Sequence, residues 1–216
     1  MQVNKKEIVE LVGKARANSK DRNFLESFEV IFNIRDVDMN QTSNNFTLNI
    51  SLPNLNKKRS LCALVDKKTK KEIKGQVDEV ILDENFEDYS DSRKAKKLAN
   101  SYDYFISQTN LMPNVARYFG RYLGPRKKMP SPSAGTVITP GEGLESEERF
   151  RNMVTVTFRD QPVIQSLVGD EDLKDEEVAE NFMLLYRRIV ENLPSRDLNI
   201  DSIAIKTTMG KPAKLS

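Results

Sequence analysis

The chain has 216 residues, of which 38% are hydrophobic and 31% charged, and its 34 Lys and Arg nearly balance 32 Asp and Glu. It contains no histidine and one cysteine, Cys62, which excludes histidine-based catalysis, a cysteine zinc cluster and an internal disulfide. No apolar run reaches the roughly 18 residues of a membrane span, and no signal-peptide pattern opens the chain. We therefore expect a cytoplasmic protein that does not contact a membrane.

The N-terminal part predicts one helix followed by two strands. The helix is indicated by apolar residues that recur on one face: Ile8, Leu11, Val12 and Ala15. Apolar residues then alternate with polar ones over residues 24–37, and a second alternating run covers 46–52. We expect these two strands to lie antiparallel to each other.

Past Pro53 the pattern changes to short continuous apolar runs, at residues 61–65, 80–82 and 104–106. Continuous apolarity is typical of strands covered on both faces, as in parallel sheets. Helix-like stretches cover residues 67–77, 92–100 and 114–122. This alternation predicts βαβ units. Cys62 lies in the first run and is interpreted as a buried small hydrophobe.

Alternating strands return at residues 154–158 and 163–168, before a long amphipathic helix at 175–193 and a last strand at 200–205. We predict two domains of mixed α/β (α+β) class. Residues 1–55 and 152–216 form a discontinuous terminal domain, and residues 56–151 form an inserted βαβ domain. The inserted domain has 19 Lys and Arg against 14 Asp and Glu, and the remainder has 15 against 18.

A basic segment stands out at residues 120–139, where cationic side chains are interspersed with glycines and prolines that interrupt regular structure. Its order is Gly-Arg-x-Leu-Gly-Pro-Arg-x-x-Met-Pro-x-Pro-x-x-Gly-Thr-Val. A second motif near the C-terminus reads Lys206-Thr207-Thr208-Met209-Gly210. Together, in this order, the two motifs resemble the signatures of the ribosomal protein L1 family, and the archaeal-type members fit the length and sequence best.

This resemblance implies a split β-α-β terminal domain with an antiparallel sheet, and a Rossmann-like inserted domain. It also implies a structural role in the large ribosomal subunit, with no catalytic activity and no cofactor. The expected partners are the 23S rRNA stalk, the deacylated tRNA that leaves the E site, and the protein's own messenger RNA, whose translation it would repress. Free of RNA, the protein is expected to be a monomer.

Residues in the terminal domain that match the family's RNA contacts are Phe24, Ser27, Glu29, Gln165, Ser202, Thr208, Met209 and Gly210. Secondary contacts with phosphates are expected from Arg121, Arg126, Lys127 and Lys128. Because the terminal domain is the more acidic one, primary recognition is expected to depend on RNA shape, backbone groups and sugar hydroxyls.

Each of these sites also has a purely structural interpretation. Phe24 falls on the same side of the alternation as Phe28 and Phe32, so it could belong to the core. The Thr-Met-Gly sequence could be an ordinary turn after a strand, and the four cations could form a solvated loop. Glu29 could accept from base amino groups or orient a neighbouring cation.

The alternative function is a nucleotide-dependent enzyme built on the Rossmann-like domain. The sequence has neither Gly-x-Gly-x-x-Gly nor a P-loop motif, which argues against it. The acidic residues between 83 and 91 lack the pattern of a calcium loop and are interpreted as solvated.

Overall fold

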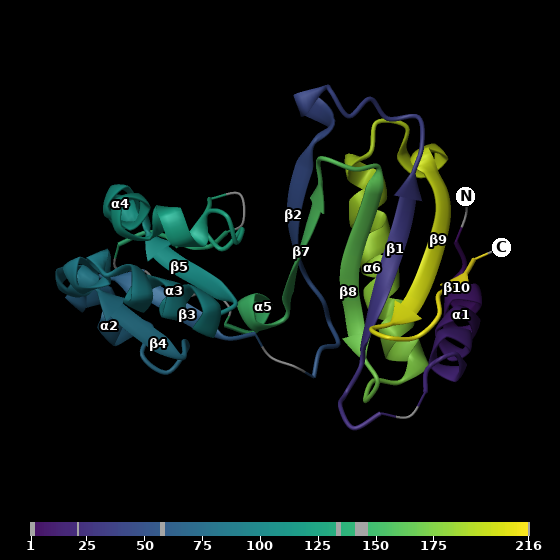
Figure 1. Cartoon of the computed structure of the whole chain (residues 1–216), viewed down its shortest axis with the longest axis horizontal. Helices are drawn as coiled ribbons and strands as arrows, with labels where there is room; N and C mark the ends of the chain where they lie inside the picture. Colours follow the sequence, from purple (N-terminus) through teal and green to yellow (C-terminus); the bar gives the residue numbers. More distant parts are fainter. Residues whose placement is uncertain (1–2, 21, 57–58, 133–134, 141–146, 216) are drawn as a thin grey trace. The chain divides into compact units, whose positions relative to one another are not determined.

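The computed structural model describes residues 3–20, 22–56, 59–132, 135–140 and 147–215. The chain divides into two compact units. The terminal unit combines Met1–Lys57 with Asn152–Ser216, and the inserted unit is Lys58–Arg151. The fold is mixed α/β, with an antiparallel sheet from the chain ends and a parallel sheet in the middle, as the sequence predicts (Figure 1).

The main sheet of the terminal unit has the strand order β10-β9-β1-β8, and its neighbours are antiparallel. The strands are β1 (Ser27–Ile34), β8 (Val163–Asp170), β9 (Ile200–Thr207) and β10 (Ala213–Lys214). β2 (Phe46–Ser51) pairs instead with β7 (Met153–Phe158) in a separate two-stranded sheet. β1 and β2, which we expected to lie antiparallel to each other, do not pair, because both take their partners from the C-terminal part of the chain.

Two helices, α1 (Lys5–Ala17) and α6 (Asp175–Asn192), cover one face of the main sheet (Figure 1). Alternate side chains of β1 point into this layer and are buried. Phe32 of β1 stacks on Phe182 of α6, with ring centroids 5.7 Å apart. The single-turn helices η1 (Thr42–Asn44) and η4 (Arg196–Asn199) lie in the loops.

The inserted unit has a parallel sheet of order β4-β3-β5-β6, with β3 (Leu61–Val65), β4 (Glu79–Leu82), β5 (Tyr104–Gln108) and β6 (Val137–Ile138). Its helical segments are α2 (Lys67–Glu72), η2 (Asp83–Ser90), α3 (Ser92–Ser101), η3 (Thr109–Leu111), α4 (Met112–Leu123) and α5 (Glu147–Arg151). α2 is shorter than predicted, since the chain leaves the helix before Gly75, which adopts a positive φ of 93°. The βαβ pattern is confirmed.

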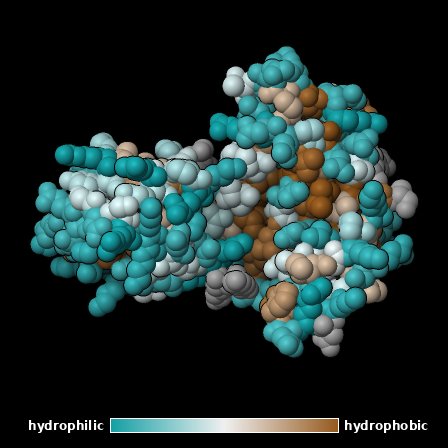
Figure 2. Space-filling model, viewed as in Figure 1, coloured by the Kyte–Doolittle hydropathy of each residue, from teal (hydrophilic) through white to brown (hydrophobic). Residues whose placement is uncertain are grey.

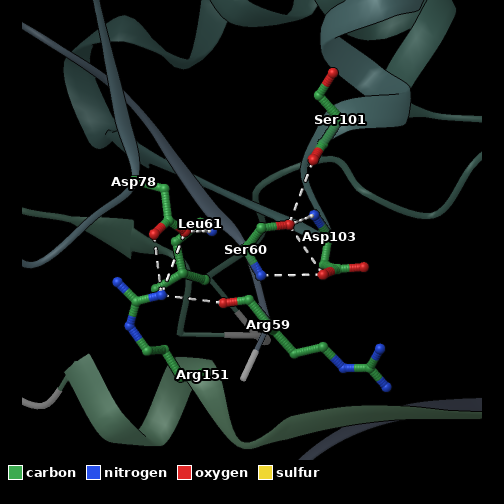
Figure 3. Close-up of polar contacts among 7 residues, drawn as sticks. All are labelled: Arg59, Ser60, Leu61, Asp78, Ser101, Asp103 and Arg151. Carbon is green, nitrogen blue, oxygen red and sulfur yellow. Dashed lines mark hydrogen bonds and ion pairs between the residues drawn. The ribbon is translucent and has the colours of Figure 1, made fainter. Parts of the chain in front are cut away.

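Hydrogen bonds hold the residues at which the chain enters and leaves the inserted unit (Figure 3). The Leu61 N–H donates to Asp78 Oδ2 at 2.7 Å, and Arg151 Nη1 donates to the same carboxylate. Arg59 N–H donates to the Arg151 carbonyl at 2.9 Å. Ser60 bonds to the Asp103 carboxylate through both its N–H and its hydroxyl. These bonds join the residues at both ends of the inserted unit to other residues of the same unit.

Cys62 is buried in β3, as its sequence context predicts. Burial raises the pKa of its thiol, and the nearby Glu79 and Asp78 carboxylates raise it further. We expect no reaction with dithionitrobenzoate in native protein at mildly alkaline pH, and release of one thiol equivalent after denaturation in guanidinium chloride. Rapid reaction of the native protein would contradict this burial.

Candidate nucleic-acid interface

The face of the main sheet opposite α1 and α6 carries three of the predicted RNA contacts, Glu29, Gln165 and Ser202. Directly paired residues share a face of an antiparallel sheet, and the register forms three rows. They are Val163–Asn33–Ser202, Gln165–Ile31–Ala204 and Leu167–Glu29–Lys206. We call these nine residues the open face. Figure 2 shows that a band of hydrophobic residues crosses the strands of this unit, with polar residues around it.

Polar side chains of the open face are bonded to one another. Asn33 Nδ2 donates to Ser202 Oγ at 2.8 Å. Lys206 Nζ lies 3.8 Å from Glu29 Oε2 and donates to the Thr208 carbonyl at 2.8 Å. Glu29 thus orients a neighbouring cation, which is one of the two roles that its sequence context allowed.

The turn at Thr208–Gly210 follows β9 and is joined to the start of β1. The Thr208 hydroxyl accepts from the Ser27 N–H at 3.1 Å and donates to the Ser27 carbonyl at 3.3 Å. The side chain of Thr208 therefore extends the β1–β9 pairing by one step. The hydroxyl oxygen keeps a lone pair that an RNA donor could use.

Gly210 is required by packing inside the protein. Its N–H donates to the Thr207 carbonyl at 3.2 Å. A Cβ at this position would lie 2.2 Å from Thr207 Oγ1, which is too close for any side chain. A glycine here follows from the fold alone, so its presence does not by itself indicate an RNA contact.

Phe24 and Met209 are the exposed apolar side chains beside this turn, with 53% and 61% of their surface accessible. β1 begins only at Ser27, so the alternation that buries Phe28 does not extend to Phe24. The inward position two residues before Phe28 is taken by Glu26, which is fully buried. The core interpretation of Phe24 is therefore wrong.

Sequence reasoning missed three residues of this region: Glu26, Asn33 and Lys206. Glu26 could have been noticed as a carboxylate on the inward side of an otherwise apolar alternation. Asn33 and Lys206 are polar residues on the outward side, and nothing in the sequence shows that they contact Ser202 and Glu29. Those contacts depend on a register between strands far apart in the chain.

The four cations of the basic segment lie in the inserted unit and differ in their surroundings. Lys128 Nζ donates to the carbonyls of Ala99 and Tyr102, at the C-terminal end of α3, and burial lowers its pKa. Arg126 donates to Asn100 Oδ1 at 3.0 Å and to the Tyr122 carbonyl. Both cations thus stabilise the end of a helix. Arg121, Arg126 and Lys127 are exposed, and Lys128 is half-buried.

Within the part of the chain that the structure describes, a buried glutamine side chain occupies the place where a nucleotide would ordinarily bind to this parallel sheet. In open α/β sheets ligands bind at the carboxyl ends of the strands, at the point where the strand order reverses direction. Here that point lies between β3 and β5. The buried Gln108 side chain fills it, accepting from the Asp66 N–H at 2.8 Å and donating to Thr69 Oγ1 at 2.6 Å.

The described residues contain no group of three or more Cys, Asp or Glu arranged to hold a metal ion, so the acidic segment near η2 forms no such site. None of the helices described is both long enough and apolar enough to cross a membrane.

Comparison with known proteins decides the family. Residues 14–211 match the sequence profile of the Ribosomal protein L1p/L10e family. The chain belongs to this family. It is 41% identical over 207 residues to large ribosomal subunit protein uL1 of Methanothermobacter thermautotrophicus, covering 94% of this chain and 96% of that protein. The protein of the same name from Thermococcus kodakarensis is 35% identical over 220 residues, covering 100% and 99%.

A third relative, uL1 of Methanosphaera stadtmanae, is 39% identical over 209 residues. These relatives are archaeal, which agrees with the expectation that archaeal-type members fit the length and sequence best. The L1 family is non-enzymatic, which confirms the expectation that this chain is not an enzyme. The nucleotide-dependent enzyme considered as an alternative is thereby excluded.

The different positions of Phe24 and Phe28 give a matched pair of variants. Phe28→Ala should lower the free energy of unfolding of the terminal unit by about 3–5 kcal/mol, because it leaves a cavity in the core. Phe24→Ala should change that free energy by less than about 0.5 kcal/mol, because the ring is exposed. Urea unfolding followed by circular dichroism measures both. A large loss for Phe24→Ala would place this ring in the core.

Proposed function

We propose that the protein is a structural constituent of the large ribosomal subunit that binds the stalk of 23S rRNA through the open face and the adjacent Thr208–Gly210 turn. Membership of the L1 family supports this proposal, and the relatives compared carry the name of a large-subunit protein. The observation on which it rests most is geometric. Ser27, Glu29, Gln165 and Ser202 lie along one face or edge of a sheet, beside the exposed Phe24 and Met209.

The composition of the open face favours recognition of RNA shape. Its one lysine, Lys206, is partly neutralised by Glu29, and its remaining polar groups are the neutral Asn33, Gln165 and Ser202. Amides and hydroxyls of this kind bond to ribose 2′-hydroxyls and base edges. Phe24 and Met209 supply apolar surface against which unpaired bases can pack. Few phosphate contacts are needed in such a mode of binding.

The inserted unit has a second part in the proposal. We propose that it moves about a two-strand hinge near residues 55 and 151 and assists the release of deacylated tRNA from the E site. Its surplus of Lys and Arg and the exposed Arg121 and Lys127 support salt-sensitive contacts with RNA phosphates. Arg126 and Lys128 would add to these contacts only with the part of their charge that still faces solvent.

The same open face is proposed to bind the protein's own messenger RNA and so to repress its translation. One surface can serve both ligands if the messenger folds into the shape that the rRNA stalk presents. Saturating stalk RNA should then displace a labelled leader of the messenger completely. Simultaneous binding of both RNAs would contradict a shared surface.

Replacing the turn side chains should weaken the specific complex. Thr208→Val combined with Met209→Ala removes a hydroxyl and an exposed apolar contact, at a cost of about 2–4 kcal/mol of binding free energy. Filter binding to a 23S stalk fragment measures the affinity. Thr208→Ser is the matched control, since it keeps the hydroxyl that bonds to Ser27, and it should bind within a few-fold of wild type.

A generic RNA duplex, titrated at several salt concentrations, distinguishes specific recognition from electrostatic attraction. The stalk fragment should be preferred, and this preference should persist as salt weakens the duplex complex. Equal affinities with a steep salt dependence for both RNAs would contradict the proposed mode of binding.

A further inference from the structure

A buried carboxylate lies directly beneath the proposed RNA-binding turn. The Glu26 side chain has no accessible surface, and groups from two segments of the chain, residues 19–22 and the turn after β9, converge on it. Arg22 Nε lies 2.6 Å from Oε1, and Ser19 Oγ donates to Oε2 at 3.2 Å. The Met209 N–H donates to Oε2 at 3.4 Å.

These partners keep the carboxylate ionised. The neighbouring Thr207 hydroxyl lowers the pKa of Glu26 most, and the Met209 N–H, Ser19 and Arg22 lower it further, although burial acts in the opposite direction. A buried charge is tolerated only when it is paired and hydrogen-bonded. The partners of Glu26 are thus held by the requirement to compensate this charge, and one of them, the Met209 N–H, belongs to the turn.

The main chain of Glu26 is fixed independently of its carboxylate. Its N–H donates to Glu171 Oε2 at 3.1 Å, and its carbonyl accepts from the Glu171 N–H at 3.1 Å. The entry into β1 therefore remains attached to the end of β8 if the side chain is changed. The contacts that depend on the carboxylate itself are those to Ser19, Arg22 and the turn.

We infer that Glu26 is a positioning residue of the RNA interface, whose buried carboxylate holds the Thr208–Gly210 turn and Arg22 in the arrangement that binds RNA. This inference rests on the proposed function. Through the Met209 N–H, Glu26 sets the direction in which the exposed Met209 side chain leaves the turn. The Glu26 carboxylate also holds Arg22 by pairing with its Nε atom, and the Arg22 side chain stays 31% exposed. The remaining N–H groups of this guanidinium can therefore bind a phosphate beside the turn.

Two variants separate this role from a general effect on folding. Glu26→Ala removes the acceptor and the charge, whereas Glu26→Gln keeps an oxygen that can accept from the Met209 N–H but leaves Arg22 without its ion pair. Asp175→Asn is the matched control, because Asp175 pairs with Arg16 at 2.9 Å in the same unit and does not touch the turn. All affinities are measured at a temperature where every variant is folded.

The first measurement uses the free protein. The Met209 amide proton resonance of wild type should titrate with Glu26. Because the pKa of Glu26 is lowered, the bonded arrangement should persist through the ordinary range of glutamate titration and be lost only as the pH falls through the lowered pKa. In Glu26→Gln this titration should be absent. An identical pH profile in both proteins overturns the inference.

The second measurement is affinity for the 23S stalk fragment. We expect a loss of about 10- to 100-fold for Glu26→Ala, a smaller loss for Glu26→Gln, and no change for Asp175→Asn, whatever its effect on stability. If Glu26→Ala does not fold, the Gln variant carries the test. Wild-type affinity in the folded Glu26 variants overturns the inference.

The two proposals fail in distinguishable ways. If wild type does not prefer the stalk fragment, or if the Thr208→Val, Met209→Ala variant binds as wild type does, the proposed RNA site is wrong. If that variant is weakened and the Glu26 variants are not, the site stands and the positioning role of Glu26 is wrong.

Discussion

Antiparallel pairing of β1 with β9 is the constraint on which the rest of the terminal unit depends. It aligns Phe28 with Thr207 at one end and Asn33 with Ser202 near the other, and so joins segments more than 160 residues apart in the chain. Side chains alternate across a sheet, so the register that buries one set of residues against the helices also fixes the set on the open face. A slip of one residue would exchange the two sets. The core and the proposed RNA site are therefore specified by the same pairing.

The surplus of acidic residues in the terminal unit does not oppose RNA binding as strongly as the net charge implies. Several carboxylates are paired with cations of the same unit: Glu26 with Arg22, Asp175 with Arg16, Glu180 with Lys5, and Glu29 with Lys206. Lys5 and Asn54 lower the pKa of Glu180. Within a Debye length of about 8–10 Å, an RNA strand meets these pairs as local dipoles and not as a uniform negative field. Neutral hydrogen bonding and apolar contact can then decide affinity.

The sequence predicted the elements well and their long-range partners poorly. Alternation and continuous apolar runs located β1, β3, β5 and β8, because each pattern reflects which faces of a strand are covered. The partner of β1 could not be predicted in this way, since pairing depends on how distant segments pack, and the adjacent β2 turned out to lie in another sheet. The same limit applies to Phe24: the buried alternation begins at Glu26, two residues later than the sequence pattern suggested. In the terminal unit the site residues came from resemblance to a family, whereas physical patterns alone would have pointed there to Glu26 as unusual.

The way each unit completes its own hydrogen bonds bears on the proposed hinge. On the terminal side, the Leu52 N–H donates to the Asn152 carbonyl, and buried Asn181 bonds to both the N–H and the carbonyl of Asn54. On the inserted side, Arg59 pairs with Arg151, which in turn bonds to Asp78. Hinge motion requires backbone rotations in a few connecting residues, and it is costly when buried polar groups lose their partners. Since each of these bonds lies within one unit, rotation in the connecting residues need not break them. Firm hydrogen bonding on either side of each connection is thus compatible with movement of the inserted unit.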